Sequence, residues 1–255
     1  MNRTNCQTPC GWNPVDGGIA KEKLRQYLAA SNNDRDLASA MFDLDGEVAA
    51  AFLEPIRLVE LVLREAIHRR ASDVYGSRWM FNSKIIDGRS FEKVTRTLKR
   101  LGNTTSSDKI VSDLNLGFWA GLFQRGGPGI TDPHVQIKHS STLWIPALSD
   151  VFRGGSPSRK TAATLSLRVS YLRKRIAHHE PILFGITQPG SRKNNQQIKQ
   201  EPLSAYSDLI ALASYLDVSL GELLTVRFRV KKLLENEVGL RATNHAKSHQ
   251  NLYWI

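Results

Sequence analysis

The sequence predicts an all-α fold, built as a bundle of helices. Apolar residues recur at steps of three or four through most segments between the loops, which is the spacing of one helix face. No run of alternating β-branched residues is convincing as a strand, and the sequence has no internal repeat. Stretches rich in Pro and Gly separate the periodic segments. A helical bundle with additional helices is therefore the expected architecture.

The first third of the chain is expected to form an arm, a short helix and a long helix. Residues 1–18 are mostly polar and rich in Pro and Gly, which predicts a flexible N-terminal arm. Residues 20–30 carry apolar side chains at helical spacing. A longer apolar stripe predicts a helix over roughly 47–74. Pro55 either opens that helix at its first turn or kinks it, and Gly76 ends it.

The remaining helices are expected to complete one domain over residues 19–240. The expected segments are a basic helix at 90–101, an apolar helix at 108–123 broken near Gly117, a loop at 125–129, a short apolar segment at 143–152, a helix at 159–180, a polar and mobile stretch at 187–200, and helices at 203–216 and 219–238. Residues 241–255 are expected to be a polar, frayed C-terminal tail, although its last four residues could dock on the domain.

Positive charge is concentrated in one part of the chain. The formal net charge is +11. Residues 153–200 hold ten basic side chains and one acidic one, Glu180, which is a net charge of +9. Such clustering suits a polyanionic partner, and nucleic acid is the obvious candidate. The alternative is a solvated basic face without a partner.

The composition favours a cytoplasmic protein without a metal or cofactor. No apolar run is long enough to span a bilayer, and the N-terminus has no apolar signal-peptide core. Cys6 and Cys10 have no further Cys and no nearby His to complete a zinc site. The Asp and Glu residues assemble into no obvious carboxylate set. We therefore expect no membrane association, no metal and no cofactor.

The candidate catalytic residues are Arg173 and His178, which have four residues between them in the segment that precedes Pro181. Arg can neutralise a phosphate, and His can exchange a proton near neutral pH. Together they could cleave RNA without a metal, by attack of the ribose 2′-hydroxyl on the adjacent phosphate. Five helical positions rotate by about 140°, so the pair must converge at a distorted helix end or across the two-fold axis of a homodimer. Alternatively, both side chains simply favour the helix dipole.

Five more residues are expected to support this site or to bind RNA. Lys174 and Arg175 extend the basic segment. His179 is either an alternative proton carrier or a hydrogen-bond partner of Glu180. Glu60 and Arg64 lie four residues apart on the long helix, which suits an ion pair. That pair is either a surface feature or part of an active-site groove.

Several segments in the same order resemble one protein family. Arg173-Lys-Arg-Ile-Ala-His-His-Glu-Pro-Ile182 resembles the Arg-Asn-Arg-Ile-Ala-His-His-Glu-Pro segment of the Abi-like proteins, which belong to the HEPN superfamily of helical ribonucleases. The other similar segments are Glu60–Ile67, Tyr75–Trp79, Leu116–Leu122 and Leu143–Leu148. The resemblance spans roughly residues 20 to 185, and ordered agreement of several segments is more specific than one short motif.

The resemblance implies a HEPN bundle, often dimeric, that acts as a toxin-like ribonuclease in abortive infection or toxin–antitoxin defence against phage. It implies RNA as substrate, a protein or RNA antitoxin as partner, and Arg173 and His178 as the catalytic pair. Lys174 departs from the Asn that usually follows the motif Arg, and Glu65 stands where Asn is frequent. Lys can only donate hydrogen bonds, whereas Asn both donates and accepts. A noncatalytic RNA-binding or partner-binding module is the alternative.

Overall fold

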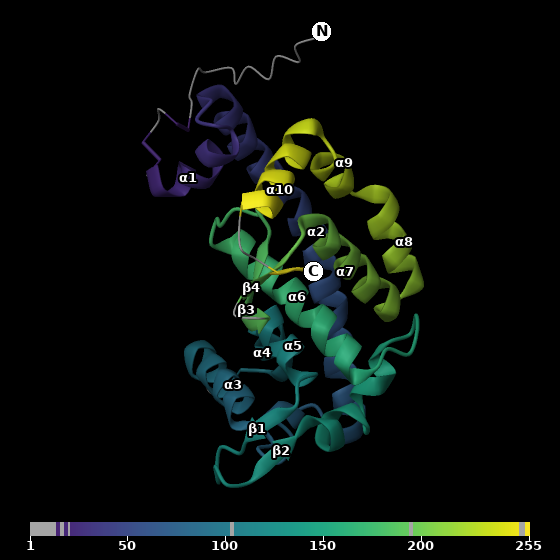
Figure 1. The fold of residues 1–255 in the computed structure, drawn as a ribbon. Helices are drawn as coiled ribbons and strands as arrows, with labels where there is room; N and C mark the ends of the chain where they lie inside the picture. The colour runs from purple at the N-terminus through teal and green to yellow at the C-terminus, as the bar shows by residue number, and fades with distance from the viewer. Residues whose placement is uncertain (1–13, 16–17, 20, 103–104, 194–195, 250–252) are drawn as a thin grey trace.

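The protein is mostly helical, as the apolar periodicity predicts (Figure 1). The computed structural model describes residues 14–15, 18–19, 21–102, 105–193, 196–249 and 253–255. Most of the expected N-terminal arm, with both cysteines, lies outside the described residues. Among the described residues the strands form only two small sheets, β1-β2 and β3-β4-β5. The all-α class is therefore confirmed, with these sheets as additions that the sequence did not predict.

The long helix α2 (Arg35–Tyr75) is the axis of the fold (Figure 1). Its 41 residues correspond to about 60 Å at the α-helical rise. The Asp34 carboxylate caps its first turn, and Gly76, with φ 82°, ends it. The helix starts earlier than expected because its buried face already begins at Ala38. Pro55 therefore lies inside the helix rather than in its first turn.

Helices at both ends of α2 cover its apolar face. α1 (Lys21–Ala30) packs against the N-terminal part of α2. α3 (Gly88–Leu101), α4 (Ser107–Asp113) and α5 (Leu116–Leu122) follow the short helix η1 (Trp79–Phe81). The expected break in the 108–123 segment is present, but it falls before Gly117. Asn115 causes it, because its side chain accepts a hydrogen bond from Phe118 N and caps α5.

The next segments lead from the first small sheet to the basic helix. β1 (Gly126–Pro128) and β2 (Gln136–Lys138) form an antiparallel hairpin where only a loop was expected. The short helices η2 (Ser140–Trp144) and η3 (Leu148–Val151) follow. The basic helix α6 (Arg159–Ala177) is capped by Ser158 and packs between α5 and α7 (Pro202–Leu216). α8 (Val218–Arg227) and α9 (Val230–Leu234) occupy the segment expected to be one helix.

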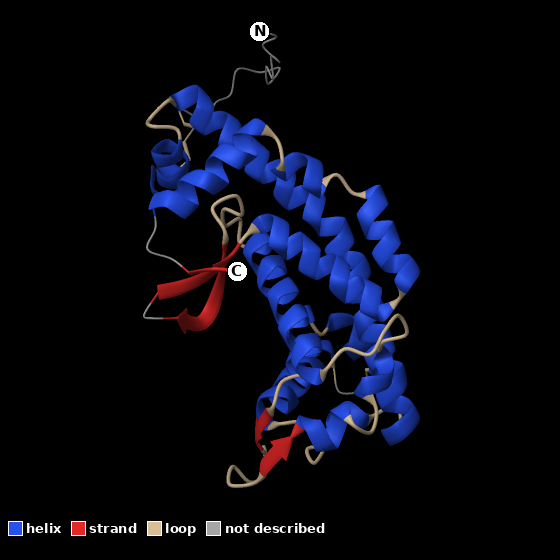
Figure 2. Cartoon of the chain, turned by 45° about the vertical axis from the view of Figure 1, so that its right-hand side comes forward, coloured by secondary structure: helices blue, strands red, loops and turns tan. Residues whose placement is uncertain are grey.

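A three-stranded sheet replaces the polar, mobile stretch expected at 187–200 (Figure 2). β3 (Ile186–Lys193) pairs antiparallel with β4 (Gln196–Gln200), and β4 pairs parallel with β5 (Tyr253–Trp254). The polarity of this stretch was misleading because its described polar side chains find hydrogen-bond partners within the fold. Gln188 is buried and donates to Gln200 Oε1 at 3.3 Å.

The C-terminal segment is folded where it is described, in contrast to the expected frayed tail. Helix α10 (Glu237–His249) packs against α1 and α2, with Ala242 and Ala246 fully buried. Two small residues four positions apart let the helix approach its neighbours closely. Trp254 then covers Gly185, where a Cβ would come within 2.5 Å of the indole. The domain boundary expected at residue 240 therefore falls within a helix.

The buried core is continuous from α1 at one end to η1 and α5 at the other. Its largest fully buried side chains are Trp79, Trp119, Phe52, Phe118, Phe123 and Phe184. None of the described helices combines the length and the hydropathy that crossing a membrane requires.

Candidate nucleic-acid interface and catalytic site

The basic helix α6 ends in a tight turn that carries both histidines of the motif. His178 is the C-cap, and His179 adopts a left-handed conformation with φ 52°. Glu180 N donates to Arg175 O, and His179 N donates to Ile176 O, each at 3.1 Å. This is the hydrogen-bond pattern of a Schellman motif, in which glycine usually takes the left-handed position. Both imidazoles are exposed, and they are carried by a turn whose backbone conformation these hydrogen bonds fix.

Arg175 fastens this turn to the helix. Its Nε donates to Pro181 O at 2.6 Å, and its Nη1 lies 3.1 Å from Glu180 Oε2. Burial lowers the pKa of the guanidinium, while Glu180 and Asp45 oppose that effect. The side chain is 13% exposed, so it is directed at the turn rather than at solvent. Arg175 was expected to contact RNA, but its geometry gives it a structural role.

A buried carboxylate holds the chain just after the turn. Asp45 Oδ1 accepts hydrogen bonds from Ile182 N and Leu183 N, each at 2.8 Å, and Oδ2 accepts one from Tyr27 at 2.9 Å. Burial raises the pKa of Asp45, and these hydrogen bonds oppose the rise. Sequence reasoning missed this residue. The available signal was an Asp on the apolar stripe of α2, in helical register with Met41 and Val48.

An open cleft brings three of the predicted site residues together. It has a volume of about 270 Å³ and lies between α2, the start of α5 and α6. Its lining residues are Glu60, Asn115, Leu116, Gly117, Ser170, Arg173 and Lys174. Arg173 is half-buried and Lys174 is exposed. Within the described part of the chain neither cation forms an ion pair, so both are available to an anion in the cleft.

A second cleft continues the first one toward α3. It measures about 210 Å³ and is lined by Lys93, Arg96, Thr97, Arg100, Asp113, Leu114, Asn115 and Phe118. Asn115 lines both clefts, so they are neighbours, and we term the two together the basic groove. Gly117 helps to keep the groove open, because a Cβ there would meet Asn115 Oδ1 at 3.2 Å and Ser170 Oγ at 3.3 Å.

Five cations line the basic groove, against two carboxylates. Lys93 Nζ lies 3.5 Å from Gly117 O, and burial, followed by the charge of Arg89, lowers its pKa. Arg96 pairs with Glu92, and Arg100 pairs with Asp113. The cationic excess over these two neighbouring clefts suits a phosphodiester backbone.

His178 does not line the basic groove. It lies at the end of α6, about 140° around the helix axis from Arg173. Its backbone N–H bonds the last carbonyls of the helix, and no hydrogen bond to its side chain joins it to another described residue. Neither cleft of the basic groove therefore contains both Arg173 and His178.

The expected ion pair between Glu60 and Arg64 is not formed among the described residues. Arg64 Nε instead lies 3.4 Å from Glu65 Oε1, and Nη1 donates to Ser112 O at 3.3 Å. Ser112 is in the last turn of α4, where unpaired carbonyls attract a cation. Arg64 therefore links α2 to α4, and Glu60 faces the basic groove.

Comparison with protein-family models, with curated proteins and with solved structures found no match. The resemblance to Abi-like proteins therefore stays a prediction from the motif segments, and the geometry of the chain itself must support any function.

Proposed function

We propose that this chain is a metal-independent endoribonuclease that acts as a toxin-like effector in phage defence. The observation that supports it best is the basic groove, which ends at Arg173 and Lys174 on the helix that also presents His178. A single-stranded RNA lying in the groove would meet Lys93, Arg173 and Lys174, which form no ion pair among the described residues. The exposed imidazole of His178 lies outside the groove, at the end of the same helix as Arg173. The defence role rests on the family resemblance alone.

The proposed reaction is a transesterification within the RNA strand. His178 accepts the proton of the ribose 2′-hydroxyl as that oxygen attacks the adjacent phosphorus. Arg173 stabilises the negative charge on the phosphoryl oxygens. The bond to the 5′-oxygen of the next nucleotide breaks, and that oxygen takes up a proton. The products are a 2′,3′-cyclic phosphate and a 5′-hydroxyl end.

A homodimer would complete the site. Because neither cleft of the basic groove contains both Arg173 and His178, we propose that a two-fold axis near the end of α6 places them together. The exposed turn at His178 and His179 is available for such a contact. A protein or RNA antitoxin would then act by blocking this surface or the basic groove.

End-group analysis of RNA incubated with the purified protein tests the proposal. Wild-type protein should produce 2′,3′-cyclic phosphate and 5′-hydroxyl ends. Loss of a general base lowers the rate by a factor on the order of 10² or more, so His178→Ala should remove at least 99% of the cleavage. His134→Ala is the matched control, because His134 is also exposed but lies away from the basic groove. Equal cleavage by wild type and His178→Ala would defeat the proposal.

The alternative function is RNA binding without cleavage. The separation of Arg173 from His178 in one chain, together with Lys174 in place of Asn, favours it. It predicts salt-sensitive RNA binding through the basic groove and no new RNA ends at any protein concentration.

A further inference from the structure

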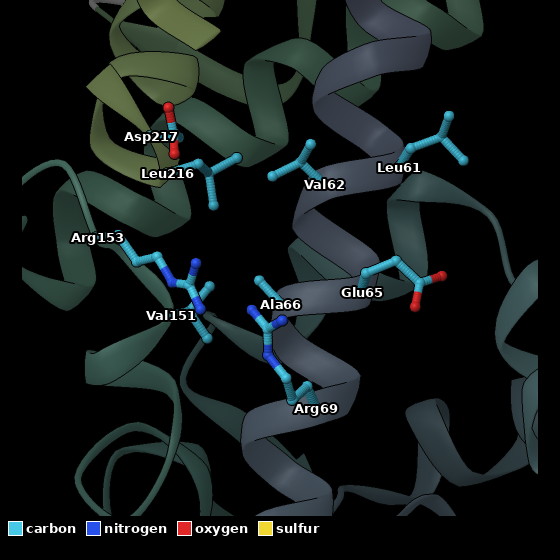
Figure 3. Close-up of a pocket in the computed structure, with 9 residues that line it drawn as sticks. All are labelled: Leu61, Val62, Glu65, Ala66, Arg69, Val151, Arg153, Leu216 and Asp217. Atoms are coloured by element: carbon cyan, nitrogen blue, oxygen red, sulfur yellow. The ribbon is translucent and has the colours of Figure 1, made fainter. Parts of the chain in front are cut away.

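A second site, shown in Figure 3, is a cleft between α2, the segment around the end of η3 and the end of α7. This cleft has a volume of about 300 Å³, which is at the lower end of the range for small-molecule sites. Its floor is apolar and consists of Leu61, Val62, Ala66, Val151 and Leu216. Val62 is 37% exposed, although it lies next to buried side chains. The floor therefore offers apolar surface that the chain itself leaves uncovered.

Two arginines face each other across one end of this cleft. Arg69 comes from α2 and Arg153 from the segment after η3, and Figure 3 shows their guanidinium groups extending toward one another. Both side chains are exposed, and neither forms an ion pair within the described ranges. Two like charges directed at one space favour an anion between them.

The backbone beneath Arg153 is held in place. Arg153 N donates to Leu216 O at 3.3 Å, and Gly154 N donates to Tyr215 O at 2.9 Å. A Cβ at Gly154 would lie 1.9 Å from Ser214 O, so only glycine allows this close approach to α7. The backbone of Arg153 is therefore held in a fixed position at the edge of the cleft.

The carboxylates around the cleft have other partners. Glu65 pairs with Arg64 at 3.4 Å and points away from the cleft in Figure 3. Asp217 caps α8 by accepting a hydrogen bond from Leu220 N at 3.1 Å. The neighbouring Asp150 pairs with Arg70 at 2.5 Å. Among the described residues, none of these acids forms an ion pair with Arg69 or Arg153.

We propose that this cleft binds a short aliphatic carboxylate. The carboxylate would lie between Arg69 and Arg153, where Arg can donate two parallel hydrogen bonds, and the hydrocarbon chain would cover Val62 and Leu216. Val62 and Arg69 lie about half a turn around α2 from Glu60, so this site and the basic groove are separate.

Calorimetric titration of the full chain with octanoate tests the site, with octanol and acetate as probes that lack the charge or the chain. We expect saturable binding of octanoate at one site per chain and at least about tenfold weaker binding of octanol and acetate. Arg69→Gln and Arg153→Gln should each weaken octanoate about tenfold or more. Arg229→Gln, an exposed arginine distant from the cleft, should leave the affinity unchanged.

Val62→Asp provides a second test, because it places a carboxylate in the cleft at an exposed position and should abolish octanoate binding. The proposal is overturned if octanoate does not saturate, if octanol binds as well, or if the cleft variants and Arg229→Gln behave alike. RNA cleavage is a separate readout, so failure here leaves the ribonuclease proposal standing.

Discussion

Arg175 and Glu180 are joined by an ion pair of 3.1 Å across the turn that ends α6. The pair takes the place of the apolar contact that often accompanies a Schellman motif between the same two positions. With the hydrogen bond from Arg175 to Pro181 O, it fixes the backbone that carries His178 and His179. Arg175 and Glu180 therefore stabilise the turn, and the turn exposes His178 and His179.

Replacing Arg175 with Met should lower the free energy of unfolding by about 2 kcal/mol, because a mostly buried charged donor loses its partners. Urea denaturation measures the change. The control is Arg227→Met, which breaks the exposed Arg227–Glu54 pair and should cost less than about 1 kcal/mol. Equal losses in the two variants would contradict a structural role for Arg175.

Replacing His179 with Gly should relieve the left-handed backbone. The change should raise the free energy of unfolding by up to about 1 kcal/mol, since φ of 52° is strained for a residue with a Cβ. Thermal or urea unfolding measures the stability, and an RNA assay measures cleavage in the same variant. Retained cleavage is expected because His178 carries the proton. Loss of cleavage would make His179 the proton carrier instead.

Lys199 should make stability depend on pH in the alkaline range. Burial, with a further effect of Arg175, lowers its pKa from 10.5 to about 8. Between these values the unfolded chain binds more protons than the folded one, so the free energy of unfolding should rise with pH from about 8 to 10.5. Urea denaturation across that window should show a smaller rise in Lys199→Met. Parallel curves for the two proteins would contradict this assignment.

Arg96→Ala should weaken RNA binding through the basic groove. Each lost contact with a single-stranded phosphate should reduce the slope of log affinity against log salt by about 0.7. Fluorescence anisotropy at several salt concentrations measures the slope. Lys231→Ala is the matched control, because Lys231 also pairs with a Glu four residues away but lies outside the groove. An unchanged slope in Arg96→Ala would show that Arg96 on α3 does not contact the RNA.

The helices could be predicted from the sequence wherever one apolar stripe faces the core. The end of α2 followed from Gly76, and the start of α6 near residue 159 followed from the Gly- and Pro-containing loop before it. The early start of α2 could not be predicted, because Pro55 suggested a helix that begins or kinks there. Packing of α2 before and after Pro55 stabilises a helix that contains this proline. The sheet at 186–200 was missed because buried polar side chains such as Gln188 satisfy one another.

The candidate site could be predicted only in part. The spacing of Arg173 and His178 identified the helix end but not the cleft, because the cleft depends on Asn115 and Glu60 from distant segments. Composition likewise grouped Arg175 with Arg173 and Lys174. Composition does not reveal that Arg175 is held by Pro181 O and Glu180, which direct it at the turn instead of at solvent.

We propose that Arg173 and His178 act on one phosphate from two protomers of a homodimer. Mixing separately inactive Arg173→Ala and His178→Ala proteins tests it most directly, with a labelled RNA and analysis of its ends. In mixed dimers one of the two sites is intact, so random pairing should restore about a quarter of the wild-type cleavage. A mixture that stays inactive under conditions where wild-type protein cleaves, with exchange of protomers shown, would contradict the account.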